Sequence, residues 1–211
     1  MGLVEDLKKD IAESRVVVVV GAGVSVQATD RAECASWTGL LRNGASHCAD
    51  LNPGLKDKWL GIVQQEIESG DLDDLLSAAE KVTAKLGGRS GGEYRRWLRE
   101  SVGALKPKHR AVLDAIQALG SPVATTNYDG LIEGITGHKA ITWRDHSEVE
   151  ALLQAREPAV LHLHGYFADP ESVVLGIRSY DSVLGDEHAQ AVLRALLLTK
   201  TLLFEIGRAH V

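Results

Sequence analysis

The stretch VVVVVGAGVS, residues 16–25, decides the fold class of this 211-residue chain. Five consecutive valines with no polar alternation are typical of a β-strand that is buried on both faces. Gly21 and Gly23, which follow the valines, allow a tight turn and a close approach of the backbone to a phosphate. The alternative is a strand-to-helix turn that needs glycine for its shape alone. Both interpretations begin from a strand that is buried on both faces.

Further apolar runs on the C-terminal side of this strand predict the rest of the sheet. They lie at Val123–Thr126, Val160–Leu163, Val173–Leu175 and Leu202–Phe204. Segments with helical spacing separate them, and such alternation is typical of a parallel sheet with helices on both faces. We therefore predict an α/β fold, Rossmann-like, with a mainly parallel sheet and a helical insertion between the first and second strands.

Apolar residues at helical spacing predict helices over 3–11, 37–50, 55–86, 93–102, 107–119 and 189–199. Gly70-Asp71 interrupts the longest of these segments, and Pro107 suits a first helical turn. The segment from 37 to 119 is too long for one crossover, so about 51–106 is predicted to be an insertion in a single domain over 1–204. Its expected inward positions are Ile62, Ile67, Leu72, Leu75, Leu76 and Val82.

Composition narrows the class of protein. A hydrophobic content of 45% allows a sizeable core, and a formal charge of −6 argues against a nucleic-acid-binding face. The first residues lack the apolar segment of a signal peptide, and the valine run is too short to cross a bilayer. Cys34 and Cys48 are expected to be reduced thiols of a cytoplasmic protein. With His47 they lack the paired spacing of a zinc site, so no metal is predicted.

A second motif, TTNYD at residues 125–129, follows the second predicted strand. Ligands of open parallel sheets bind outside the carboxyl ends of the strands. There the Asn127 amide could orient a water or hold a sugar hydroxyl, and the Asp129 carboxylate could accept from an amide nitrogen. The alternative is that Asn127 or Asp129 caps a helix that begins near Gly130.

A third motif, HLHG at residues 162–165, follows the third predicted strand. His164 lies at the strand end, where its side chain could reach a cleft and abstract a proton near neutral pH. His162 points to the same side but deeper, and we interpret it as a packed or hydrogen-bonded core histidine. The alternatives are a purely structural His164, or a metal held by both histidines.

With these three motifs in this order, the chain resembles the sirtuin family in its wider, silent-information-regulator-like sense. The resemblance covers about 16–204, although 51–106 matches no known part of the family. It implies that NAD⁺ is bound as a substrate and that its glycosidic bond is cleaved. It implies catalytic roles for His164, the general base, and Asn127, which positions the ribose or the attacking water. The implied NAD-binding residues are Gly21, Ala22, Gly23, Ser25, Thr126, Asn127 and Asp129.

Departures from the deacetylases of the family suggest a particular branch. The chain has no cysteine after Cys48, whereas those deacetylases carry a four-cysteine zinc ribbon after the catalytic His-Gly. Ser36-Trp37 with Leu40-Leu41, and Tyr180 with Leu184, resemble the branch found in bacterial antiphage defence proteins, which hydrolyse NAD. This resemblance implies a homo-oligomer and a fused or separate sensor or effector module. Trp37 would line the pocket by the same analogy, or else be a core aromatic.

The resemblance ends after Phe204. The last seven residues, 205–211, look like what a common sequencing adapter encodes, and we interpret them as a non-native tail of a longer natural protein.

Three other functions remain open from the sequence. An NAD-dependent protein deacylase would need an acyl-lysine channel. A non-catalytic domain that binds NAD or ADP-ribose and regulates a fused module would bind without turnover. An NAD(P)-dependent oxidoreductase is disfavoured because Val26 occupies the third glycine place of the dehydrogenase fingerprint.

Overall fold

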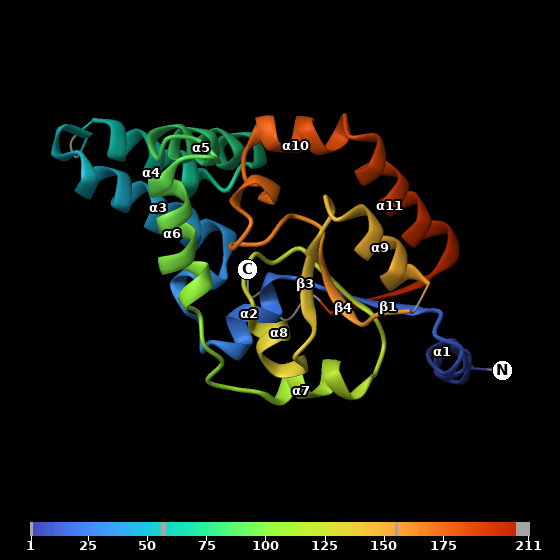
Figure 1. Ribbon diagram of the computed structural model, residues 1–211. Coiled ribbons are helices and arrows are strands. Elements are labelled where there is room, and N and C mark those ends of the chain that lie inside the picture. The colour runs from blue at the N-terminus through green and yellow to red at the C-terminus, as the bar shows by residue number, and fades with distance from the viewer. Residues whose placement is uncertain (1, 56–57, 155, 206–211) are drawn as a thin grey trace.

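A computed structural model describes residues 2–55, 58–154 and 156–205 of the chain. It has an α/β architecture with helices packed around a sheet (Figure 1). Five parallel strands form this sheet, in the order β3-β4-β2-β1-β5. This confirms the Rossmann-like fold class that the sequence predicts. The strands are β1 (Val16–Val20), β2 (Val123–Thr125), β3 (Lys139–Thr142), β4 (Ala159–His162) and β5 (Thr201–Glu205).

The valine strand β1 lies inside the sheet, between β2 and β5. Val18 pairs with Val123 of β2, and Val16 pairs with Thr201 of β5. All five valines are buried, which explains why the strand carries no polar alternation.

Helices cover both faces of this sheet. One hydrophobic cluster joins the strands to α2, α7 and α8, with Leu7 and Ile11 of α1 packed at its border. A second joins the opposite face to α9 and α11. The helices are α1 (Leu3–Ala12), α2 (Ala22–Ala28), α3 (Trp37–Leu51), α4 (Trp59–Ser69), α5 (Leu72–Lys85), α6 (Gly92–Glu100), α7 (Ala111–Ala118), α8 (Leu131–Thr136), α9 (His146–Leu153), α10 (Ile177–Leu184) and α11 (Glu187–Thr199), with short 3-10 turns at Glu33–Ala35, Pro53–Leu55, Val102–Ala104 and Pro170–Ser172.

The helices between β1 and β2 form a core of their own. Helices α3–α6 pack together beside the sheet, and α10 lies against α5 (Figure 1). The predicted break at Gly70-Asp71 is confirmed: Gly70 ends α4 with a φ of +69°, and the Asp71 carboxylate accepts from the Asp73 and Asp74 amides to cap α5.

Val173 and Leu175 also belong to this helical core, and here a prediction is wrong. Residues 173–175 form no strand but a buried, extended segment. The Val174 N–H donates to the His164 carbonyl, and the Val174 carbonyl accepts from the Tyr128 hydroxyl. The apolar run 173–175 is explained by its burial in the helical core and does not indicate pairing in the sheet. The fifth strand is instead β3. The sequence does not predict it, because its first residue, Lys139, is exposed and its buried apolar part is short.

Two smaller expectations are also wrong. Helix α7 begins at Ala111 and not at Pro107, because the amides of Lys108 and His109 both donate to the carbonyl of Ala28. Ile62 is 43% exposed and Leu72 62% exposed, although both were expected to face inward. Helix α4 turns Ile67 to the core, as predicted, and Val63 in place of Ile62.

The predicted tail at 205–211 lies outside the described residues, apart from Glu205, which ends β5. Among the described residues, no helix is both long and apolar enough to cross a bilayer.

Candidate functional site

The loops after β1, β2 and β4 meet at one edge of the sheet, because these strands are direct neighbours. A cavity of about 170 Å³ lies there, between the strand ends and the helical core. It brings together five of the predicted catalytic and NAD-binding residues: Ala22, Thr126, Asn127, Asp129 and His164. The lining consists of Ala22, Cys34, Ala35, Ser36, Trp37, Leu40, Val102, Thr126, Asn127, Tyr128, Asp129, His164 and Tyr180.

Asn127 is fixed by bonds from both strands that precede the cavity. Its backbone N–H donates to the Thr125 hydroxyl over 3.0 Å, and that hydroxyl donates to the Val20 carbonyl over 3.0 Å. Its side-chain Nδ2 donates to the Gly21 carbonyl over 3.0 Å and to the Ser25 hydroxyl over 2.8 Å. The Asn127 amide therefore has both of its N–H groups engaged, while its oxygen is the group left to address a ligand.

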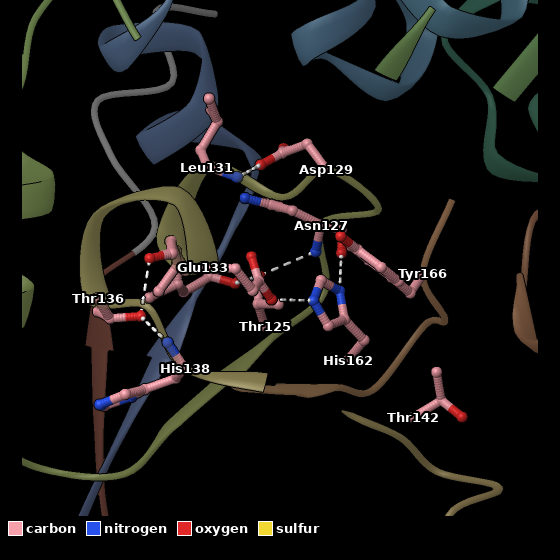
Figure 2. A network of polar contacts seen from close by, with 12 residues as sticks. Thr125, Asn127, Asp129, Leu131, Glu133, Thr136, His138, Thr142, His162 and Tyr166 are labelled. Carbon is pink, nitrogen blue, oxygen red and sulfur yellow. Dashed lines mark hydrogen bonds and ion pairs between the residues drawn. The ribbon is translucent and has the colours of Figure 1, made fainter. Parts of the chain in front are cut away.

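Asp129 serves the helix and the site with different oxygens. Its Oδ1 accepts from the Leu131 N–H over 3.1 Å at the start of α8 (Figure 2), although the N-cap residue itself is Gly130. Its Oδ2 accepts from the Ser25 hydroxyl over 2.6 Å. Burial raises the pKa of Asp129, while the bonds from Ser25 and Leu131 lower it. A carboxylate oxygen has two lone pairs, so each can still accept from a ligand.

Ser25 lies beneath the cavity and not in its wall. It is 2% exposed, and its hydroxyl is shared between Asn127 and Asp129. The Gly21 carbonyl accepts the hydrogen bond from Asn127 Nδ2. Gly23 lines an adjacent groove of about 690 Å³, which shares Ala22 and Ser36 with the cavity and also contains Arg31 and Arg42.

His164 enters the cavity from the end of β4 and meets the ring of Tyr180 edge-on, with 5.7 Å between ring centroids. Burial lowers the pKa of His164, which favours the neutral imidazole that can take up a proton. Gly165 after it has a φ of +90°, and a Cβ there would collide with the Ser172 carbonyl. Glycine is thus required at this turn, and the turn aims His164 at the cavity.

With this geometry in place, a family comparison supports the resemblance. Residues 121–207 match the family model described as the SIR2-like domain. This part, which is less than half of the chain, is similar to the SIR2-like domain. The matched part begins just before β2, so it includes Asn127, Asp129 and His164 with their strands. SIR2-like domains use NAD⁺ as a substrate. The glycine loop after β1 lies outside the matched range.

His162 is a core residue, as the sequence predicted. It is 0% exposed; its Nδ1 lies 2.8 Å from the Asn127 carbonyl oxygen and its Nε2 lies 2.6 Å from Glu133 Oε1 (Figure 2). Because both ring nitrogens are engaged, the alternative of a metal held by His162 and His164 does not fit. In the described ranges, no three His, Cys, Asp or Glu side chains are grouped to hold a metal.

Three aromatic residues, Trp37, Tyr128 and Tyr180, line the cavity. The Tyr128 hydroxyl donates to the Val174 carbonyl over 2.8 Å, and burial raises the pKa of Tyr128 well above its usual value. Trp37 packs on the helical core and also lines the cavity, and its buried indole N–H has no acceptor among the described residues. Both interpretations of Trp37 are therefore correct in part.

Sequence reasoning missed Tyr128 and Glu133. Tyr128 lies inside the TTNYD motif, between Asn127 and Asp129, so its position in the sequence indicates that it is near the site. Glu133 lies on α8 and reaches His162 only through the packing of that helix against β4, for which the sequence carries no signal.

Proposed function

We propose that this chain is an NAD⁺ glycohydrolase, which cleaves the bond between nicotinamide and ribose with water. The observation that carries the proposal is the meeting of Asn127, Asp129 and His164 in one cavity beside the glycine loop. An amide, a carboxylate and a neutral imidazole are the groups needed to orient water, hold a carboxamide and accept a proton.

The proposed reaction divides the work among these three residues. Asp129 accepts from the carboxamide N–H₂ of nicotinamide. The bond from C1′ of the ribose to the ring nitrogen breaks, its electron pair leaves with neutral nicotinamide, and C1′ gains oxocarbenium character. Asn127 orients a water through its side-chain oxygen, the water oxygen bonds to C1′, and His164 takes the released proton. The products are nicotinamide, ADP-ribose and one proton.

The other predicted NAD⁺-binding residues lie mostly in the loop after β1. Gly21, Ala22 and Gly23 approach the diphosphate and ribose by the family resemblance, with Thr126 beside them in the cavity wall. Arg31 and Arg42 lie in the adjacent groove, where guanidinium groups suit a diphosphate. Because Ser25 already bonds Asn127 and Asp129, we assign it a positioning role and no direct contact with NAD⁺.

The cellular role that we propose is antiphage defence by depletion of NAD⁺. It rests on the resemblance of Ser36-Trp37, Leu40-Leu41 and Tyr180 to that branch. Four of these residues line the cavity: Ser36, Trp37, Leu40 and Tyr180. The same resemblance supports a homo-oligomer and a sensor or effector partner in the cytoplasm. Expression of the chain should lower cellular NAD⁺ during infection, and unchanged NAD⁺ and phage yield would contradict this role.

The test of the activity is release of nicotinamide from NAD⁺, measured for the chain and for Asn127→Ala and His164→Ala. His109→Ala is the matched control, because that imidazole is 64% exposed and does not line the cavity. We expect turnover in the parent and the control, and loss of at least about a hundredfold in the two site variants. Turnover that persists in both site variants would contradict the proposed site.

The other functions give different outcomes in the same assay. Consumption of NAD⁺ only when an acyl-lysine peptide is present would indicate a deacylase. Tight NAD⁺ binding without turnover, with the same affinity in His164→Ala, would indicate a regulatory domain. Either result would overturn the glycohydrolase proposal.

A further inference from the structure

A buried acid–base pair lies directly behind the cavity, and the proposed reaction does not use it. His162 ends β4, and Glu133 reaches it from α8 with a side chain that is 12% exposed. Neither residue lines the cavity. The pair nevertheless touches the site, because the second ring nitrogen of His162 bonds the main chain of Asn127 (Figure 2).

The partners of the two nitrogens define where the protons are. The Asn127 carbonyl can only accept, so His162 Nδ1 must carry a hydrogen. Nε2 faces a carboxylate at 2.6 Å, a distance typical of a charge-assisted bond. An ionised Glu133 in this buried position requires a compensating charge, since its Oε2 has no partner among the described residues. If the proton between Nε2 and Glu133 lies on Nε2, His162 is a cation opposite an ionised Glu133, which the NMR measurement below decides.

Resting on the proposed function, we propose that Glu133 and His162 form a positioning pair for the NAD site. The pair holds the Asn127 main chain through the carbonyl bond, and the His162 cation keeps the nearby Asp129 ionised so that it can accept the carboxamide. Neither residue touches substrate; both act through Asn127 and Asp129.

The surroundings of Asp129 support the second part of this role. Burial raises the pKa of Asp129 most; the Ser25 hydroxyl, the Leu131 N–H and attraction to His162 lower it, and repulsion from Glu133 raises it. Tyr166, whose ring lies 4.6 Å from that of His162, is the other titratable group facing these acids. Without His162, two carboxyl groups would share a buried region with no cation between them, which disfavours the ionised form of both.

The deciding experiment measures NAD⁺ affinity against pH by calorimetry, in the His164→Ala background where turnover does not interfere. Affinity should fall as Asp129 becomes protonated. Adding His162→Gln should move this fall to higher pH by about one unit. Adding Glu133→Gln to His162→Gln should move it part of the way back, because the repelling carboxylate is removed as well.

A purely structural pair predicts the opposite pattern. The double variant would then be no better than His162→Gln, and the pH at which affinity falls would not move; that outcome would overturn the proposal. His188→Gln is the matched control, since His188 is a half-buried histidine that does not line the cavity. It should leave the pH dependence of affinity unchanged.

A second measurement needs neither activity nor a variant that folds well. In the otherwise unaltered chain, nitrogen NMR of His162 should show both ring nitrogens protonated at the pH where Asp129 is ionised. A neutral His162 at that pH would overturn the proposal. If the chain binds NAD⁺ but does not cleave it, the glycohydrolase proposal is wrong. The calorimetry and the NMR measurement would still decide whether Glu133 and His162 position the NAD site.

Discussion

The Ser25 hydroxyl donates to the Asp129 carboxylate over 2.6 Å, across 104 positions of the sequence. The same hydroxyl accepts from Asn127, so one buried serine holds the amide and the carboxylate of the site at a fixed separation. The bond also joins α2 to the loop after β2, and thereby links two of the three loops that form the cavity.

Ser25→Ala should therefore impair stability and activity together. The Asn127 N–H and the Asp129 oxygen would each lose a buried partner, which costs about 1–3 kcal/mol of unfolding free energy. We expect kcat for NAD⁺ cleavage to fall by at least about tenfold, because both side chains are freed to move. Ser101→Ala is the control: its buried hydroxyl bonds the Trp97 carbonyl, so urea unfolding should show a similar loss with kcat unchanged. Equal kcat in the two variants would contradict the positioning role.

Gly165→Ala tests the turn that aims His164. Its φ of +90° is strained for alanine, and the new Cβ would meet the Ser172 carbonyl. Gly70→Ala isolates the first effect, because Gly70 has a φ of +69° and open space around it. We expect a loss of about 1–2 kcal/mol for Gly70→Ala. Gly165→Ala should lose about 1–3 kcal/mol more. Denaturant midpoints for both measure this, and equal losses would show that the close approach is unimportant.

The activity should persist below the usual pKa of histidine. Burial lowers the pKa of His164 from 6.5, and a general base is active in its neutral form. As the pH falls, His164 stays neutral to a lower pH than an exposed imidazole, so the acidic limb of kcat/KM should have its midpoint below 6.5. A pH–rate profile, compared with the pH dependence of NAD⁺ affinity in His164→Ala, measures it. A midpoint above 6.5 that the affinity does not share would exclude His164 as the base.

Trp37→Phe removes an indole N–H that has no acceptor among the described residues, while an aromatic ring remains. Stability should change by less than about 1 kcal/mol, because no internal hydrogen bond is lost. If the N–H donates to NAD⁺, KM should rise by about tenfold. Trp97→Phe gives the reverse result: its N–H bonds Asn43 at 3.0 Å, so stability falls and KM holds. An unchanged KM in Trp37→Phe would assign Trp37 to packing alone.

The His146–His188 stack makes one helix contact sensitive to acid. The two rings join α9 to α11 with centroids 3.4 Å apart. Burial, and then the neighbouring His146, lowers the pKa of His188 from 6.5. The unfolded chain therefore binds the proton more readily, and stability should decline as the pH falls below 6.5. His188→Phe retains the stacking but cannot be protonated, so its melting temperature should depend less on pH between 7 and 5. Identical pH dependence would exclude the stack as the cause.

Much of the fold could be predicted because its strongest signals are local. The valine run of β1 is buried along its whole length, and the break between α4 and α5 falls at the glycine and the aspartate that the sequence marked. Sheet membership is a non-local property, and there prediction failed. Leu175 and Val173 are as buried as strand residues, yet pack on helices, whereas Lys139 begins a strand while exposed.

The candidate site could be predicted for the same reason, because its signals are local. Asn127, Asp129 and His164 each lie in the loop that follows a strand, so parallel topology brings them to one edge of the sheet. The depth of Ser25 and the approach of Glu133 to His162 depend on how α2 and α8 are rotated against the sheet, and residue type does not fix that rotation.

The neighbours of β1 in the sheet set the order in which the molecule can be assembled. Residues 16–20 are made early on the ribosome, yet their partners β2 and β5 are made much later, after α3–α6 in the first case. Helices α3–α6, whose contacts are mostly local, can pack before the valine strand has paired with β2 and β5. An apolar, β-branched segment that remains unpaired is prone to pairing with other chains. Yield of folded protein should therefore be limited by protection of residues 16–20 during synthesis more than by the stability of the finished domain.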